Sequence, residues 1–92
     1  MSVSADVLDR AWTKVGLSID DKKRDRFAYL RVNGKLILFT RRSYGRGKVS
    51  DHLADLIRQQ MKLDEDQFAE LLACPLKEGG YLAILRAKRL LE

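Results

Sequence analysis

The chain has 92 residues, of which 46% are hydrophobic and 34% charged, and its formal net charge is +5. This composition is typical of a soluble globular protein, and the length predicts one domain, residues 1–92. No run approaches the roughly 20 apolar residues that span a bilayer, and the first residues lack the apolar stretch of a secretory signal. The single cysteine excludes an intramolecular disulfide. We therefore expect a cytoplasmic protein with no membrane contact.

The first predicted element is an N-terminal helix of about three turns. Ser4 is a suitable N-cap, because its hydroxyl accepts a hydrogen bond from a free helix N–H group. Gly16 is a suitable terminator, because glycine adopts the left-handed conformation readily. Between them, apolar residues recur at helical spacing: Val7, Leu8, Ala11, Trp12 and Val15.

A β-hairpin follows. Residues 27–32 and 36–39 are rich in aromatic and branched side chains and are separated by Asn33-Gly34, a pair typical of a type I′ turn. Before the hairpin, residues 17–19 form either a short strand or an extended connection, and residues 20–26 form a charged connection that can extend a strand edge. We expect Phe27 and Phe39 to pack beneath the helices, because large aromatic residues dominate small cores.

The second half of the chain is predicted to be helical. Residues 41–48 form a loop, and Ser50 then caps a helix with the apolar stripe Leu53, Leu56, Ile57 and Met61. Asp64 and Gln67 have the spacing of a capping box for a third helix, which Pro75 ends nearby. After Gly79-Gly80, a last helix begins around Tyr81.

This order predicts an α+β fold. An N-terminal helix precedes a small antiparallel sheet that is packed by helices, and a C-terminal helical extension follows. We expect residues 4–62 to form the central part and residues 63–92 to form the extension.

The charge is concentrated between Lys22 and Lys48. This segment has ten basic residues and one acid, Asp25, whereas the rest of the chain has eight basic residues and twelve acids. Such segregation attracts polyanions, unless acids from elsewhere in the fold balance the segment. The loop at its end combines bases with glycines and precedes a helix N-terminus, which favours an anion. The predicted nucleic-acid contacts are Lys22, Lys23, Arg24, Arg26, Arg41, Arg42, Tyr44, Arg46 and Lys48.

Aromatic residues interleave with these basic residues, and aromatic rings can stack on unpaired nucleobases. Core packing is the competing interpretation for the strand residues, and Tyr44 is the ring we expect to be exposed. His52, the only histidine, lies in the first turn of the second predicted helix and is a weak candidate for catalysis. Cys74 and His52 lack the spacing of metal ligands, so no metal site and no cofactor are predicted.

The stretch from Phe27 to Lys35, then Arg41-Arg42, then residues 53–59 (Leu-Ala-Asp-Leu-Ile-Arg-Gln) resembles HicA-type toxins of toxin–antitoxin systems. The resemblance covers roughly residues 4–62. It implies a fold like that of double-stranded-RNA-binding domains, RNA as the target and a paired antitoxin. In that family a Gly-Ser-His motif supplies the catalytic histidine. The matching positions here read Arg24-Asp25-Arg26, so the resemblance implies RNA binding and puts ribonuclease activity in doubt.

Three hypotheses follow. The first is an RNA-binding domain that contacts structured or double-stranded RNA through the basic hairpin, loop and helix N-terminus. The second is a ribonuclease toxin with displaced catalytic residues, for which His52, Tyr44 and Lys48 are the candidates. The third is a protein-interaction module that binds an acidic partner such as an antitoxin, with the C-terminal helices forming a homodimer.

Overall fold

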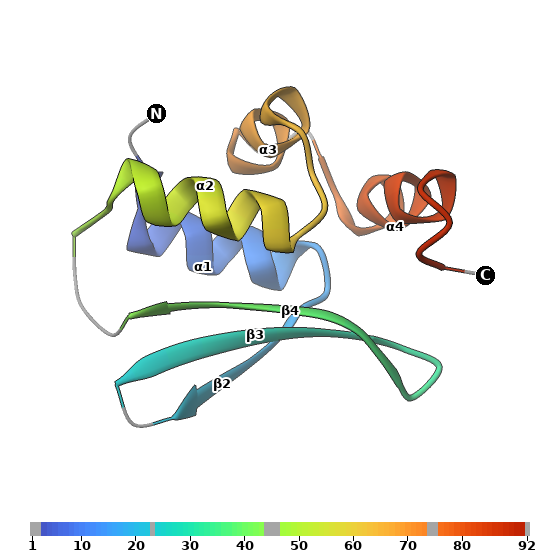
Figure 1. Ribbon diagram of the computed structural model, residues 1–92, viewed down its shortest axis with the longest axis horizontal. Coiled ribbons are helices and arrows are strands. Elements are labelled where there is room, and N and C mark those ends of the chain that lie inside the picture. Colours follow the sequence, from blue (N-terminus) through green and yellow to red (C-terminus); the bar gives the residue numbers. More distant parts are fainter. Residues whose placement is uncertain (1–2, 23, 44–46, 74–75, 92) are drawn as a thin grey trace.

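The computed structural model describes residues 3–22, 24–43, 47–73 and 76–91, and it confirms the α+β class (Figure 1). A three-stranded antiparallel sheet, ordered β2-β3-β4, lies on one side of the molecule. The helices lie on its other side, with α1 and α2 directly over the sheet. In the part of the chain that the structure describes, no helix is long and apolar enough to cross a membrane.

Helix α1 (Ala5–Lys14) begins and ends where the sequence predicts. The Ser4 hydroxyl accepts a hydrogen bond from the Val7 N–H group at 3.2 Å, which is the expected N-cap interaction. Gly16 follows the helix with φ of +90°, a conformation that favours glycine. The helix buries one face, including Leu8 and Trp12, against the rest of the fold.

The sheet is formed by β2 (Ser18–Lys22), β3 (Asp25–Val32) and β4 (Lys35–Ser43). The predicted hairpin is confirmed. Asn33 and Gly34 have φ values of +54° and +80°, which are the two positive values that a type I′ turn requires. The strands are longer than predicted. The charged residues 20–22 belong to β2, and β4 continues through residues 41–43, which the sequence assigned to a loop.

A second, two-stranded sheet joins the beginnings of α1 and α2, and nothing in the sequence pattern indicated it. Strand β1 (Val3–Ser4) pairs antiparallel with β5 (Lys48–Val49); β1 leads directly into α1, and β5 leads into the next helix through Ser50. The Ala5 N–H group also donates to the Gly47 carbonyl at 2.8 Å. As a result, the N-termini of both helices lie at the same end of the molecule (Figure 1).

The three C-terminal helices are α2 (Asp51–Gln60), α3 (Glu65–Leu72) and α4 (Glu78–Ala87). The Ser50 N-cap of α2 and the capping box of α3, formed by Asp64 and Gln67, are confirmed. Helix α4 starts before Tyr81, because both glycines that precede this residue are already helical. Pro75 and Cys74 lie outside the described residues.

One continuous core includes buried residues from both predicted parts of the chain. Its largest members come from the helices: Trp12, Phe68 and Tyr81 are each at most 1% exposed. The Tyr81 hydroxyl donates to the Met61 carbonyl at 2.9 Å, and the Lys14 ammonium donates to the Leu71 carbonyl at 2.7 Å. These bonds fix α4 against the end of α2 and α3 against α1.

Two predictions about buried side chains are wrong. On α2, Leu56 is exposed and the small Ala54 is buried in its place, since the apolar stripe is rotated by part of a turn. On the sheet, Phe39 is 49% exposed and Phe27 is only half-buried, on the face away from the helices. The helix-facing positions hold smaller residues instead, among them Ala28 and Thr40, both fully buried.

Candidate nucleic-acid interface

The predicted basic residues gather at one end of the fold, which we call the basic end. It consists of the turn between β2 and β3, the last residues of β4, and β5 at the start of α2 (Figure 1). The described bases at this end are Lys22, Arg24, Arg26, Arg41, Arg42 and Lys48. The other predicted contacts, Lys23, Tyr44 and Arg46, lie outside the described residues.

Two of these arginines hold the sheet to α1. Asp9, in the second turn of α1, accepts hydrogen bonds from Arg42 Nε and Nη2 at 2.9 and 2.8 Å and from Arg26 Nη1 at 2.7 Å. Arg26 Nε also donates to Asp21 at 2.7 Å, and Arg42 is only 5% exposed. Both guanidinium groups therefore lie on the helix-facing side of the sheet, where they bridge α1, β3 and β4.

The other basic side chains at the basic end are more accessible to solvent than Arg26 and Arg42. Arg41 Nη1 lies 2.9 Å from Asp25 Oδ2, and Lys22 Nζ lies 3.5 Å from Asp20 Oδ2, but both basic side chains are more than half exposed. Exposed ion pairs of this kind are weak, so a phosphate can replace the carboxylate. Arg24 and Lys48 are exposed and form no ion pair with any residue in the described part of the chain.

The two helix N-termini contribute less positive potential than the sequence suggests. Ser4 and Ser50 already accept a backbone N–H group of α1 and α2, respectively. Asp6 and Asp51 occupy the first turns, where their carboxylates offset the helix dipole. Contacts to an anion at the basic end therefore depend on the basic side chains rather than on the helix ends.

His52 lies exposed in the first turn of α2. It is the only histidine of the chain, so a two-histidine acid–base pair is excluded. Over the described ranges, no three His, Cys, Asp or Glu side chains are grouped to hold a metal ion.

A second surface is formed by the side of the sheet that faces away from the helices; we call it the open sheet face. Directly paired residues of neighbouring strands project to the same side, and the register pairs Phe27 with Arg41, Tyr29 with Phe39, and Arg31 with Leu36. Among the described residues, no helix or strand covers this side (Figure 1). The face is made by Ser18, Asp20, Lys22, Asp25, Phe27, Tyr29, Arg31, Leu36, Phe39, Arg41 and Ser43.

Three aromatic rings form a row on the open sheet face. The ring centroids of Phe27 and Tyr29 are 6.0 Å apart with an interplanar angle of 12°, and those of Tyr29 and Phe39 are 6.2 Å apart at 37°. Lys22 Nζ lies 5.8 Å from the Phe27 centroid and 5.7 Å from that of Tyr29, and Arg31 Cζ lies 5.4 Å from that of Tyr29. Hydrogen bonding to the Tyr29 side chain raises the pKa of Lys22.

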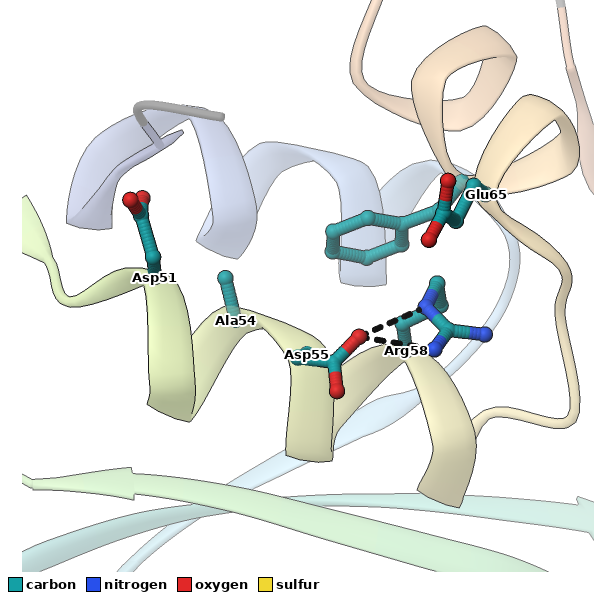
Figure 2. A pocket seen from close by; sticks show the side chains of 6 residues that line it. Asp51, Ala54, Asp55, Arg58 and Glu65 are labelled. Carbon is teal, nitrogen blue, oxygen red and sulfur yellow. Dashed lines mark hydrogen bonds and ion pairs between the residues drawn. The ribbon is translucent and has the colours of Figure 1, made fainter.

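A cleft of about 350 Å³ lies between α2 and α3 (Figure 2). Asp51, Asp55 and Glu65 line it together with Arg58. Arg58 Nη2 donates to Asp55 Oδ1 at 2.7 Å, and this hydrogen bond lowers the pKa of Asp55. Because Arg58 already neutralises one of the carboxylates, the cleft presents a mixed rather than a strongly acidic lining.

No protein-family model, no curated protein and no solved structure matches the chain. The resemblance to HicA-type toxins therefore stays a prediction that depends on the short segments quoted above.

Proposed function

We propose that the protein binds RNA, with the basic end holding phosphate groups of a structured segment. The contacts are the exposed bases Lys22, Arg24, Arg41 and Lys48. The observation that carries the proposal is the convergence of three separate segments, the β2–β3 turn, the end of β4 and β5, at the end where α1 and α2 begin.

The arrangement of elements supports RNA as the target. A helix, three antiparallel strands and a second helix follow one another, and both helices lie on the same side of the sheet (Figure 1). This is the order that the HicA resemblance and the double-stranded-RNA-binding fold imply. Domains of that kind recognise duplex RNA by its shape and its phosphates, which suits a surface of separated basic side chains.

The test is a charge reversal at the basic end. Arg24→Glu combined with Lys48→Glu should lower the affinity for a 16-base-pair RNA duplex about tenfold or more, because two phosphate contacts become repulsive. Neither side chain has an ion-pair partner in the described part of the chain, so the fold should be unaffected. The matched control is Lys35→Glu with Lys77→Glu, which changes the net charge equally at exposed sites away from the basic end.

The salt dependence provides a second readout. Four phosphate contacts predict that the logarithm of the affinity falls with the logarithm of salt concentration with a slope of about 3 to 4. The double reversal should reduce this slope by about 2, and the control should leave it unchanged. Equal affinities for the duplex in the wild type, the double reversal and the control would refute the basic end as the RNA site.

A protein partner is the second candidate. It is favoured by Phe39 and Leu36, which are 49% and 45% exposed on the open sheet face. The HicA resemblance suggests an acidic antitoxin as that partner. Co-purification with a small acidic protein, free of nucleic acid, would support it. The ribonuclease alternative is tested on the same RNA samples, since cleavage that disappears in His52→Ala would assign it to this residue.

A further inference from the structure

The aromatic row of the open sheet face has no role in the fold's core and none in duplex binding at the basic end. The rings of Phe27, Tyr29 and Phe39 lie side by side on the uncovered side of the sheet, and the large aromatic residues of the core come from the helices. Phe39 is 49% exposed, and Phe27 and Tyr29 are only partly buried. Aromatic surface left uncovered costs solubility, so a ligand for this face accounts for the row better than folding does.

We propose that the open sheet face stacks unpaired RNA bases, so that the RNA bound by this protein carries a single-stranded segment beside its structured part. This inference rests on the proposed function and names its substrate class. Unpaired bases stack on aromatic side chains regardless of their sequence, because each base has a π-face. Three rings accommodate up to about three bases.

Charge complementarity favours RNA over a protein partner on this face. Lys22, Arg31 and Arg41 lie beside the rings, where they meet the phosphates of a strand whose bases stack on those rings. The two carboxylates of the face, Asp20 and Asp25, each lie against one of these cations. Arg31 has no ion-pair partner in the described part of the chain. Lysine is depleted at protein interfaces, whereas arginine and aromatic residues are not, and all three of these cations suit a phosphate backbone.

The two surfaces are continuous. Lys22 and Arg41 belong to both the basic end and the open sheet face, since each lies near the end of its strand and projects away from the helices. A strand that leaves a duplex held at the basic end therefore reaches the rings past Asp20 and Asp25, whose carboxylates are each paired with a cation. The substrate class that fits is a duplex with a single-stranded overhang or an open loop.

The experiment separates ring stacking from simple apolar contact. Phe39 is the most exposed of the three rings and projects away from the core, so its replacement leaves the buried residues untouched. Phe39→Leu keeps an apolar side chain without a ring, and Phe39→Tyr keeps the ring. Leu36→Ala is the matched control, because it removes apolar surface from the same strand and the same face. Urea unfolding confirms that each variant is folded.

The probes are a fluorescein-labelled 12-nucleotide oligouridylate, which forms no duplex, and the 16-base-pair RNA duplex. Phe39→Leu should lower the affinity for oligouridylate about fivefold or more, whereas Phe39→Tyr and Leu36→Ala should stay within about twofold of the wild type. All three variants should bind the blunt duplex like the wild type. This pattern supports base stacking on the open sheet face.

Three results overturn the inference. In the first, Phe39→Leu binds oligouridylate as the wild type does, while Arg24→Glu with Lys48→Glu still weakens duplex binding. Base stacking is then refuted and the proposed function stands. In the second, the wild type binds neither probe, and both proposals fail. In the third, oligouridylate does not bind and the protein forms a dimer that Phe39→Leu dissociates, which identifies the face as an interface between two copies of the chain.

Discussion

The ion-pair network around Asp9 makes a stringent test of how the sheet is attached to the helices. Asp9→Ala removes the carboxylate that three guanidinium nitrogens of Arg26 and Arg42 share at 2.7–2.9 Å. Arg26 and Arg42 differ in their surroundings once the Asp9 carboxylate is removed. Arg26 keeps its second partner, Asp21, and a quarter of its side chain is exposed, whereas the Arg42 side chain is only 6% exposed.

The expected loss of stability in Asp9→Ala follows from the burial of Arg42. Removing one partner of a buried ion pair costs about 3–5 kcal/mol. In Asp9→Ala the Arg42 guanidinium loses this carboxylate while it stays desolvated, although it keeps its hydrogen bond to the Ser43 carbonyl. Asp9 itself is one-fifth exposed, so water reaches part of the vacated site and lowers the cost. We therefore expect Asp9→Ala to reduce the free energy of unfolding by about 2–4 kcal/mol. This is a large part of the roughly 5–15 kcal/mol that stabilises a typical domain.

Urea unfolding, followed by far-ultraviolet circular dichroism and by the fluorescence of the buried Trp12, measures this change. Asp6→Ala is the matched control. It makes the same chemical change in the same helix, but Asp6 is exposed and forms no ion pair within the described residues, so it should cost less than about 1 kcal/mol. The effect of alanine on helix propensity is common to both variants and cancels in their difference.

A double variant examines the physical reason. Asp9→Leu with Arg42→Met replaces the buried pair by apolar side chains, so no unpaired charge remains in this position. It should be more stable than Asp9→Ala, because an apolar replacement of a whole buried pair is often neutral. If the cost of Asp9→Ala lies within about 0.5 kcal/mol of that of Asp6→Ala, the ion pairs of Asp9 do not stabilise the fold and the reasoning is refuted.

Two further predictions concern α4 and α2. Tyr81→Phe removes the hydrogen bond to the Met61 carbonyl and should cost about 1–2 kcal/mol. Burial raises the pKa of Tyr81, so the contribution of this residue to stability is complete below the ordinary tyrosine pKa and is lost as the pH rises above it. The free energy of unfolding of the wild type should therefore fall more steeply in alkali than that of Tyr81→Phe. Tyrosinate absorbance follows the ionisation that accompanies unfolding. Arg58→Gln should raise the pKa of Asp55 toward its ordinary value, because the hydrogen bond that lowers it is lost. The stabilisation by that bond exists above the ordinary aspartate pKa and disappears on acidification, and a carboxyl-carbon NMR titration of both proteins detects the shift.

Signals confined to a few neighbouring residues predicted the local structure well. The caps at Ser4 and Ser50, the capping box at Asp64 and the Asn33-Gly34 turn all form as expected, and with them the α+β class. Each of these features is formed by hydrogen bonds or dihedral angles within about four residues, so it depends little on distant parts of the chain. The pairing of β1 with β5, in contrast, joins segments 44 or more residues apart and involves only two residues from each.

The sequence predicts the wrong side of the sheet for the helices, because both sides of β3 carry apolar residues. Side chains alternate between the two sides of a strand, so Phe27 and Tyr29 lie on one side of β3 and Ala28 and Leu30 on the other. This alternation does not show which of the two pairs faces the helices. The helices bring their own large side chains to the core, and the strands then contribute smaller ones. Trp12 of α1, fully buried, takes the volume that Phe27 and Phe39 were expected to fill.

The same alternation divides the basic residues, which the sequence presents as one continuous segment. Arg26 and Arg42 project toward α1 and meet Asp9, which lies 17 and 33 residues away along the chain, so the charge count alone could not reveal their partner. Arg41, next to Arg42 in sequence, projects to the opposite side and shares it with the aromatic row. Strand geometry thus converts part of the basic segment into structural ion pairs and leaves the rest, together with the rings, on accessible surfaces. An RNA ligand of this fold would therefore be bound by a few separated cations plus stacking, and its affinity should depend on the rings as much as on the charge.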